Sequence, residues 1–532
     1  MSSVAAPPEP GRVRPRGVAG HAGAVWSRVA ERVRAHPVQA TVAGVAALVL
    51  VSLWLRTRAL DAGFWIDEGI SVGIASFPFF DIPGVLKLDG SPPLFYLLLH
   101  LWMQLFGTSE SATHSLSLVF ALLSIPTAYW AGRSLFSARV GWAAAALAAL
   151  NPFLTYYAQE TRMYAMSATI GLVVAAAFLH LFVARDRRYL PVFVVALTVQ
   201  LYSHNWAIFL GVGTVVALAA LWRWAEATER RALLRDAVIA YGATGVLYLP
   251  WVPTLLYQAA HTGAPWAQTP DLQALLVAVG LLLGGATPAI ALLLVAGNGL
   301  AGRVRTEADR RTAALIILTV AAALVAWGLS QISPAFANRY LAAFVGPLLL
   351  LVAVGLSNAG RLGLVTFVLI LAFWFDARTG QIETKSNARS VGTSIQTLVT
   401  AGDLVVSTQP ETLPLVKYYL PQGVRYANAL GVDDPRVFDW TDALDRLNAA
   451  KPRATIDSLL RTLRPGQELV LVQPILRTAN WRAPWTSLVR KRSIQWERRL
   501  DADPRVRREA VVPVFGYDRL PRGIRAIVYR VR

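Results

Sequence analysis

Residues 38–73, VQATVAGVAALVLVSLWLRTRALDAGFWIDEGISVG, join a long apolar run to two adjacent carboxylates, Asp67 and Glu68. The run 38–55 approaches the roughly 20 residues that a membrane-spanning helix needs. Six arginines lie within residues 1–37, and no small-residue cleavage site follows the run. We therefore expect an uncleaved first span with segment 1–37 in the cytoplasm, because basic loops stay inside. Asp67 and Glu68 then lie just outside the membrane.

The composition of the 532-residue chain is typical of a protein with many spans, since 55% of its residues are hydrophobic, 16% are charged and the mean hydropathy is +0.45. The formal net charge of +19 comes almost wholly from arginine, because the chain has only five lysines. In a membrane protein such an excess fixes topology and contacts anionic headgroups, so we expect membrane lipids and no nucleic acid as partners. The absence of cysteine excludes disulfides, thiolate catalysis and Cys-ligated zinc.

Apolar runs and arginine-rich turns alternate along the chain and predict about eleven spans, with the N-terminus inside and the C-terminus outside. After the first, three spans lie at about 112–134, 140–157 and 237–256, and seven others end at ARDRR (184–188), YSHNW (202–206), the basic stretch 223–235, Arg303 and Arg305, SPAFANRY (333–340), Arg361 and Asp376.

The stretch PPLFYLLLHLWMQLFG, which starts at Pro92, is apolar but only about 15 residues long, too short to span a membrane. A span here would also place Arg133 and Arg139 outside, against the distribution of positive charge. We expect an external juxtamembrane helix within an external loop, residues 58–111.

The chain becomes polar after Asp376. Strand-like runs such as DLVVST (403–408) and ELVLVQP (468–474) alternate with helix-like ones such as ATIDSLLRTL (454–463). This alternation predicts an extracytoplasmic α/β domain over residues 377–532, after a transmembrane domain over 38–376.

The predicted topology brings acids, arginines and aromatic side chains to the outer face. Charged groups near a membrane are costly and mark a functional site or a polar cavity. Together they are what binding of a phosphate-linked sugar at the lipid surface requires. The residues are Asp67, Glu68, Asp89, Gln159, Glu160, Arg162, His204, Asn205, Trp266, Arg339 and Tyr340.

Several motifs carry a resemblance to a known family. They are WIDE (65–68), DGSPPLFYLLLHLWMQLFG (89–107), YYAQETRMYA (156–165), NRYL (338–341) and KSN (385–387). This pattern resembles the bacterial glycosyltransferase family 39 and the Rgt-like glycosyltransferases of the GT-C superfamily, whose relatives include protein O-mannosyltransferases and the aminoarabinose transferase of lipid A.

The resemblance extends over residues 45–390 and is strongest over 60–165. Two positions depart from it, since many relatives have His-Pro-Pro where Ser91 begins Ser-Pro-Pro, and arginine near His114. The first departure weakens any role for residue 91.

The resemblance implies a GT-C type polytopic α-helical fold in the bacterial plasma membrane. It implies an inverting transfer in which a sugar leaves a polyprenyl phosphate on the outer face and joins an acceptor hydroxyl. Mannose is the sugar that the relatives favour. The acceptor is a glycan, a lipid or a protein of the cell envelope, and the sequence does not identify which.

A hydroxyl becomes a good nucleophile when a carboxylate accepts its proton, and we expect Asp67 to be this general base. Glu68 and Asp89 are the other catalytic candidates. Glu68 could instead position Asp67 or cap the next helix. Asp89 could equally be a turn former in LDGSPP. A double displacement through a covalent intermediate is not excluded by the sequence.

A phosphate leaving group needs positive charge rather than a general acid, and guanidinium groups grip phosphate oxygens in pairs. We therefore expect Arg162 and Arg339, with Tyr340, to bind the donor phosphate. Glu160 and Arg162 could instead form an ion pair at a helix end, and His204 is more readily a structural hydrogen bonder than a catalyst. The candidate substrate-binding residues are Gln159, Glu160, Tyr164, His204 and Asn205.

We assign no metal ligand, although adjacent acids allow a weakly specified divalent metal. The competing function is a lipid-linked-sugar flippase or transporter, which would show two related halves and broken helices. No such halves are evident in the sequence. A noncatalytic assembly subunit is the third possibility, but it would have no reason to keep Asp67, Arg162 and Arg339 on one side.

Overall fold

The computed structural model describes residues 35–304, 310–376, 380–475, 482–512 and 523–532. The six N-terminal arginines and Arg305 lie outside the described residues, as does the side chain of Arg303. The described residues divide into two units, with the boundary between Leu48 and Val49. The second unit contains the cavity described below.

Most described elements before residue 376 are helices. They are α2 (Pro37–Arg56), α3 (Ile66–Ala75), α4 (Ile82–Asp89), α5 (Leu94–Phe106), α6 (Glu110–Leu135), α7 (Ala138–Leu150), α8 (Pro152–Tyr157), α9 (Tyr164–Phe178), α10 (Leu190–Ser203), α11 (Ala207–Trp224), α12 (Ala227–Tyr248), α13 (Val252–His261), α14 (Leu272–Leu282), α15 (Ala286–Val304), α16 (Arg310–Ile332), α17 (Ala342–Asn358) and α18 (Gly360–Phe375). Short turns of helix lie at Leu179–Val183, Arg187–Tyr189, Leu249–Trp251 and Asn338–Leu341.

Seven helical segments of the described chain are long and apolar enough to cross a membrane, and an eighth if one bent pair counts as a span. The helical membrane fold is therefore confirmed, but the expected count of eleven is not reached by length and composition. The shortfall arises because three expected spans are shorter helices: α7, which ends before Pro152, α10 and α18. The apolar stretch from Pro92 contains the short helix α5.

The expected eighth span is not straight. Helices α14 and α15 meet at an angle of 86°. Gly284 and Gly285 lie at the break with φ values of 79° and 122°. These are backbone conformations that glycine adopts without strain, so the glycines allow the break.

The C-terminal part of the chain contains a six-stranded sheet in the order β3-β2-β1-β4-β6-β5. The strands are β1 (Leu404–Ser407), β2 (Arg425–Asn428), β3 (Gly431–Val432), β4 (Glu468–Pro474), β5 (Val506–Val511) and β6 (Ile524–Val531). β1 is parallel to β2 and β4, whereas the other pairs are antiparallel. The helices are α19 (Gly380–Glu383), α20 (Ala388–Gln396), α21 (Leu413–Tyr418), α22 (Ala443–Ala449), α23 (Pro452–Leu460) and α24 (Pro484–Asp501), with a short turn at Pro410–Thr412.

Both predicted strand runs fall in the middle of this sheet, as β1 and β4, and both are fully buried. The predicted helix-like run 454–463 overlaps α23, which ends at Leu460. A core of 21 buried residues, including Trp485 and Trp496 of α24, packs around the strands. The α/β arrangement follows from this alternation, while its location outside the membrane stays a prediction.

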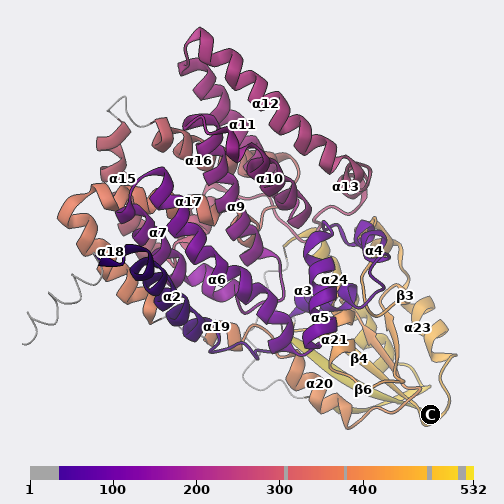
Figure 1. Ribbon diagram of the computed structural model, residues 1–532. Helices are drawn as coiled ribbons and strands as arrows, with labels where there is room; N and C mark the ends of the chain where they lie inside the picture. Colours follow the sequence, from indigo (N-terminus) through magenta and orange to yellow (C-terminus); the bar gives the residue numbers. More distant parts are fainter. Residues whose placement is uncertain (1–34, 305–309, 377–379, 476–481, 513–522) are drawn as a thin grey trace, which may run out of the picture. The chain divides into compact units, whose positions relative to one another are not determined.

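Helix α3, which carries Asp67, lies beside α21 of the C-terminal part of the chain (Figure 1). Two of its glycines contact that part closely. A Cβ atom at Gly69 would lie 2.5 Å from the Cα atom of Leu415 in α21, and one at Gly73 would overlap the carbonyl group of Arg436. The spacing of four residues puts both glycines on one face of the helix. The backbone of α3 therefore contacts the backbone of the C-terminal domain directly.

Replacing Gly73 with alanine is expected to lower stability, because the new methyl group overlaps backbone that cannot rotate away. Overpacking of this kind costs about 1–3 kcal/mol. The measurement is the thermal unfolding midpoint of the purified protein. Gly84→Ala in α4 is the matched control, since no atom lies within 4 Å of a Cβ there. Equal midpoints for the two variants would contradict the close contact.

Candidate active site

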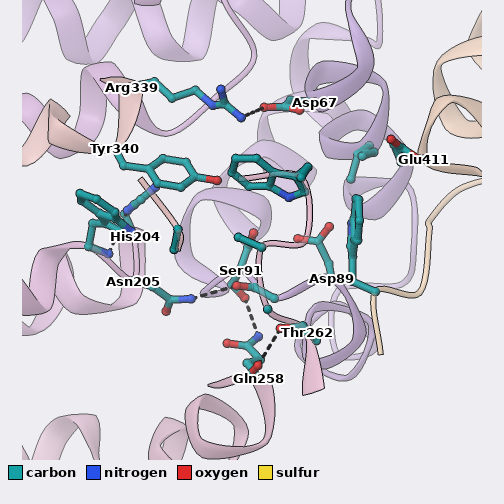
Figure 2. Close-up of a pocket in the computed structure, with 18 of the residues that line it drawn as sticks. Asp67, Asp89, Ser91, His204, Asn205, Gln258, Thr262, Arg339, Tyr340 and Glu411 are labelled. Atoms are coloured by element: carbon teal, nitrogen blue, oxygen red, sulfur yellow. Dashed lines mark hydrogen bonds and ion pairs between the residues drawn. The ribbon is translucent and has the colours of Figure 1, made fainter. Parts of the chain in front are cut away.

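A cavity of about 570 Å³ is lined both by the helical part and by the C-terminal domain (Figure 2). This volume is within the usual range for small-molecule sites. The helical part contributes α3, the turn after α4, the 204–206 turn, α13 and the loop that follows it, and the segment before α17. The C-terminal domain contributes Gln409, Glu411, Trp440 and Thr486.

Asp67 and Arg339 come together at this cavity. Asp67 lies in the first turn of α3, and its Oδ2 atom is 3.4 Å from a terminal nitrogen of Arg339. Each side chain is 19% exposed, so both remain accessible from the cavity. Figure 2 shows the pair on one side of the space.

The guanidinium group of Arg339 is held by aromatic side chains. Its Nε donates to the hydroxyl of Tyr164 over 3.0 Å. Its charge lies 5.2–5.5 Å from the ring centres of Trp65, Trp266 and Tyr340, close enough for cation–π attraction. These contacts orient the guanidinium toward an anionic partner.

The side chain of Arg162 is more buried than that of Arg339, and it forms hydrogen bonds within the protein. One terminal nitrogen donates to the carbonyl of Asp67 over 3.3 Å, to the hydroxyl of Ser71 over 3.0 Å and to that of Tyr96 over 3.2 Å. The side chain lines the cavity but also fixes the first turn of α3. Arg162 thus positions Asp67 and adds positive charge beside it.

Glu68 is fully buried and is not among the cavity-lining residues. Its carboxylate lies 2.6 Å from Nε2 of His114 and 2.7 Å from Nζ of Lys385, and it accepts the backbone N–H of Thr161 over 2.8 Å and of Trp65 over 3.1 Å. Burial would raise the pKa of Glu68, but Lys385 and His114 outweigh it and lower the pKa to about 2. The structure therefore supports the positioning and capping alternative for Glu68.

Asp89 ends α4 and lines the cavity. Burial raises its pKa, although a hydrogen bond with Ser91 and the charge of Arg162 act in the opposite direction. Gly90, which follows it, has φ of 93°, so the turn-forming alternative also fits the local backbone.

His204 and Asn205 line the cavity as well. The Nδ1 atom of His204 accepts the backbone N–H of Trp206 over 3.0 Å. Burial, with the charges of Arg162 and Arg339, lowers the pKa of His204 to about 3, so the ring is neutral. The hydrogen bond matches the structural role favoured by the sequence.

Three predicted substrate-binding residues are not among the cavity-lining residues. They make contacts with residues near the cavity instead. Gln159 accepts the backbone N–H of Ala59 over 2.8 Å, and Glu160 accepts the indole N–H of Trp65 over 2.5 Å. Tyr164 holds Arg339, as described above. These are structural contacts rather than positions at the cavity wall.

Among the described residues, no three His, Asp or Glu side chains form a group that could hold a metal ion. Asp67, Asp89, His204 and Glu411 all line the cavity, but no three of them lie close enough together to form such a group. No metal enters the proposal below.

Sequence reasoning missed the cavity residues Gln258, Thr262, Gln409, Glu411 and Trp440. The only signal in the sequence was the position of Gln409 and Glu411 directly after a predicted strand. The carboxyl ends of parallel strands are common ligand sites in α/β sheets.

The fold and the cavity together define a polytopic membrane protein with acids, arginines and aromatic side chains around one site. Residues 90–257, less than half of the chain, match the family model described as dolichyl-phosphate-mannose-protein mannosyltransferase. A comparison with curated protein sequences finds no match.

The chain is also similar to crystal structures of ArnT from Cupriavidus metallidurans. The TM-scores are 0.57 for the apo state, at 16% identity, and 0.59 for the state bound to undecaprenyl phosphate, at 15% identity. Both matches cover 81% of this chain and 93% of the ArnT chain. The family match and the shared fold confirm the resemblance to GT-C glycosyltransferases.

Proposed function

We propose that the protein is an inverting membrane glycosyltransferase. It transfers a sugar, mannose being the favoured candidate, from a polyprenyl phosphate to an acceptor hydroxyl on the extracytoplasmic face. Asp67 is the general base, and Arg339, with the charge of Arg162, binds the phosphate. The ArnT structure with bound undecaprenyl phosphate supports a donor of this class.

The observation that carries the proposal is the pairing of Asp67 with Arg339 at the cavity wall. A carboxylate that accepts the acceptor's proton and a guanidinium that neutralises the departing phosphate are the two groups that a single displacement needs. The distance of 3.4 Å between them is long for a charge-assisted hydrogen bond. A phosphate oxygen and a hydroxyl can therefore replace this contact at modest cost.

The eleven-span topology belongs to the same proposal. Adding α7, α10 and α18 to the eight segments of sufficient length gives eleven, with the N-terminus in the cytoplasm and the cavity outside. Tilted or thinned local bilayer accommodates short helices.

The alternative is a lipid-linked-sugar flippase, which the bent pair α14–α15 would suit, since broken helices occur in transporters. It gives no reason for a carboxylate beside the phosphate-binding arginine. The glycosyltransferase therefore remains the better-supported function.

The proposal is tested with membranes that contain the full chain, supplied with a panel of labelled polyprenyl-phosphate sugars and total envelope acceptors. We expect label to pass into an acceptor from at least one donor. Label that stays on the lipid but changes sides of the membrane would favour the flippase and contradict the glycosyltransferase.

Replacing Arg339 with glutamine is expected to weaken donor use by roughly 10- to 100-fold, because a hydrogen bond to a charged group contributes about 1.5–3 kcal/mol. The measurement is the KM and kcat for the donor. Arg389→Gln is the control, since Arg389 pairs with Glu110 and is not among the cavity-lining residues. A donor KM and kcat within twofold of the original would remove Arg339 from phosphate binding.

A further inference from the structure

Three cavity-lining side chains each keep an oxygen atom that accepts no hydrogen bond from the described part of the protein. They are Oδ1 of Asn205, Oε1 of Gln258 and Oε2 of Glu411. A buried acceptor without a donor costs about 1–3 kcal/mol. These oxygens therefore call for hydroxyl or N–H groups from water or from a ligand.

The orientation of both amides is fixed by their neighbours. The amide nitrogen of Asn205 donates to the carbonyl of Gly90 over 2.9 Å. That of Gln258 donates to the carbonyl of Leu86 over 2.9 Å and to that of Ser91 over 3.3 Å. Because a carbonyl can only accept, exchanging the nitrogen and oxygen positions would break these bonds. The free atoms are thus oxygens and need donors.

Glu411 comes from the C-terminal domain and follows the carboxyl end of β1. Its Oε1 atom accepts from the indole of Trp485 and from the amide of Gln409, each over 2.8 Å. Burial raises the pKa of Glu411. The residue is only 6% exposed, so its position is set by the protein before any ligand binds.

The sheet topology points independently to the same place. The chain leaves β1 to form β2 on one side, whereas β4 pairs with β1 on the other, so β1 and β4 flank a point where the strand order reverses. Ligands of open α/β sheets bind outside the carboxyl ends of the strands at such a point. Gln409 and Glu411 lie at the carboxyl end of β1.

The chemistry of the three oxygens selects the ligand. A phosphate group offers acceptor oxygens, which suits Arg339 and is unsuited to Asn205, Gln258 and Glu411. A sugar ring carries several hydroxyl donors, and Trp440, which lines the same cavity, adds an aromatic side chain to the wall.

We propose that Asn205, Gln258 and Glu411 form a carbohydrate subsite. In it, Glu411 of the C-terminal domain accepts a hydrogen bond from a sugar hydroxyl. This inference rests on the proposed function and assigns part of the cavity to the sugar rather than to the lipid phosphate. The hydroxyl belongs either to the donor sugar or to a carbohydrate acceptor.

The test replaces Glu411 with glutamine in the full-length protein. The glutamine oxygen can still accept hydrogen bonds from Trp485 and Gln409, as Oε1 does. An amide nitrogen, which can only donate, then takes the place of the free Oε2 atom. Glu509→Gln, on the exposed strand β5, is the matched control. Binding of methyl α-mannoside, methyl β-glucoside and methyl β-galactoside is measured by saturation-transfer NMR on purified protein, beside binding of undecaprenyl phosphate and of the peptide analogue N-acetylglycine methylamide.

We expect at least one methyl glycoside to bind the original protein and to bind Glu411→Gln about 10-fold more weakly, with undecaprenyl phosphate binding unchanged. In transfer assays, a raised donor KM places the donor sugar at Glu411, whereas a raised acceptor KM places a carbohydrate acceptor there. Glycoside binding that is absent, or that is the same in both proteins, would overturn the inference, as would preferential binding of the peptide analogue. Glycoside binding without any sugar transfer would instead overturn the proposed function and leave the subsite standing.

Discussion

Replacing Asp67 with asparagine is expected to reduce sugar transfer by roughly 10²- to 10⁴-fold, the usual contribution of a general base. Asparagine has nearly the same shape but cannot accept a proton from the acceptor hydroxyl. The loss should appear in kcat, because we assign binding of the phosphate and of the sugar to other residues. The measurement is the rate of label transfer from a saturating polyprenyl-phosphate donor.

The control for this prediction is Asp81→Asn, an exposed acid that precedes α4 and is not among the cavity-lining residues. An unchanged thermal midpoint for Asp67→Asn would separate lost chemistry from lost folding. Transfer at the original rate would show that another group accepts the proton. Asp89 would then be the next residue to replace, since it shares the cavity and its raised pKa suits a base.

Replacing Lys385 with methionine is expected to destabilise the protein by about 3–5 kcal/mol, because removing one partner of a buried ion pair leaves the carboxylate of Glu68 without its lysine counter-charge. Lys385 and Glu68 are 1% and 0% exposed, and the distance between their charged atoms is 2.7 Å. The measurement is the free energy or the midpoint of unfolding. Lys451→Met, at an exposed lysine, is the control.

The same variant should be more sensitive to acid. The pKa of Glu68 is about 2, below the ordinary value of 4.5, so its carboxylate contributes stability above about pH 4.5 that is lost as the pH falls toward 2. Without Lys385 the pKa of Glu68 rises, and this contribution shrinks and disappears at higher pH. Parallel pH–stability curves for the variant and the original protein would contradict this account.

The helical fold was predictable because apolar length and arginine distribution are local properties of the chain. The same pattern could not show that Gly284 and Gly285 break a span, since the hydropathy of the segment remains high across them. It also could not decide which short helices cross the bilayer. Strands β1 and β4 were predictable because they are short, β-branched runs between turn-forming residues.

The candidate site was predictable in part. Asp67, Asp89, Arg162, Arg339 and Tyr340 do meet at one cavity. Glu68 could not be separated from Asp67 by sequence, because only the helix direction shows that one side chain lines the cavity and the other is buried.

Glu411 lies more than 300 residues after Asp67 in the sequence and belongs to the C-terminal domain, whereas Asp67 lies in α3. Local sequence patterns do not show that these two residues line the same cavity. The unpaired oxygens of Asn205 and Gln258 likewise become visible only when the neighbours of their amide nitrogens are known.

The glycine contact of α3 with Leu415 and Arg436 has a consequence for inheritance and for engineering. Helix α3 and the C-terminal domain fit each other at the level of the main chain, where side-chain repacking offers no tolerance. A hybrid protein that exchanges the C-terminal domain between relatives would have to exchange residues 66–75 with it. Changes in the C-terminal domain between relatives would thus be paired with changes in a distant segment of the gene.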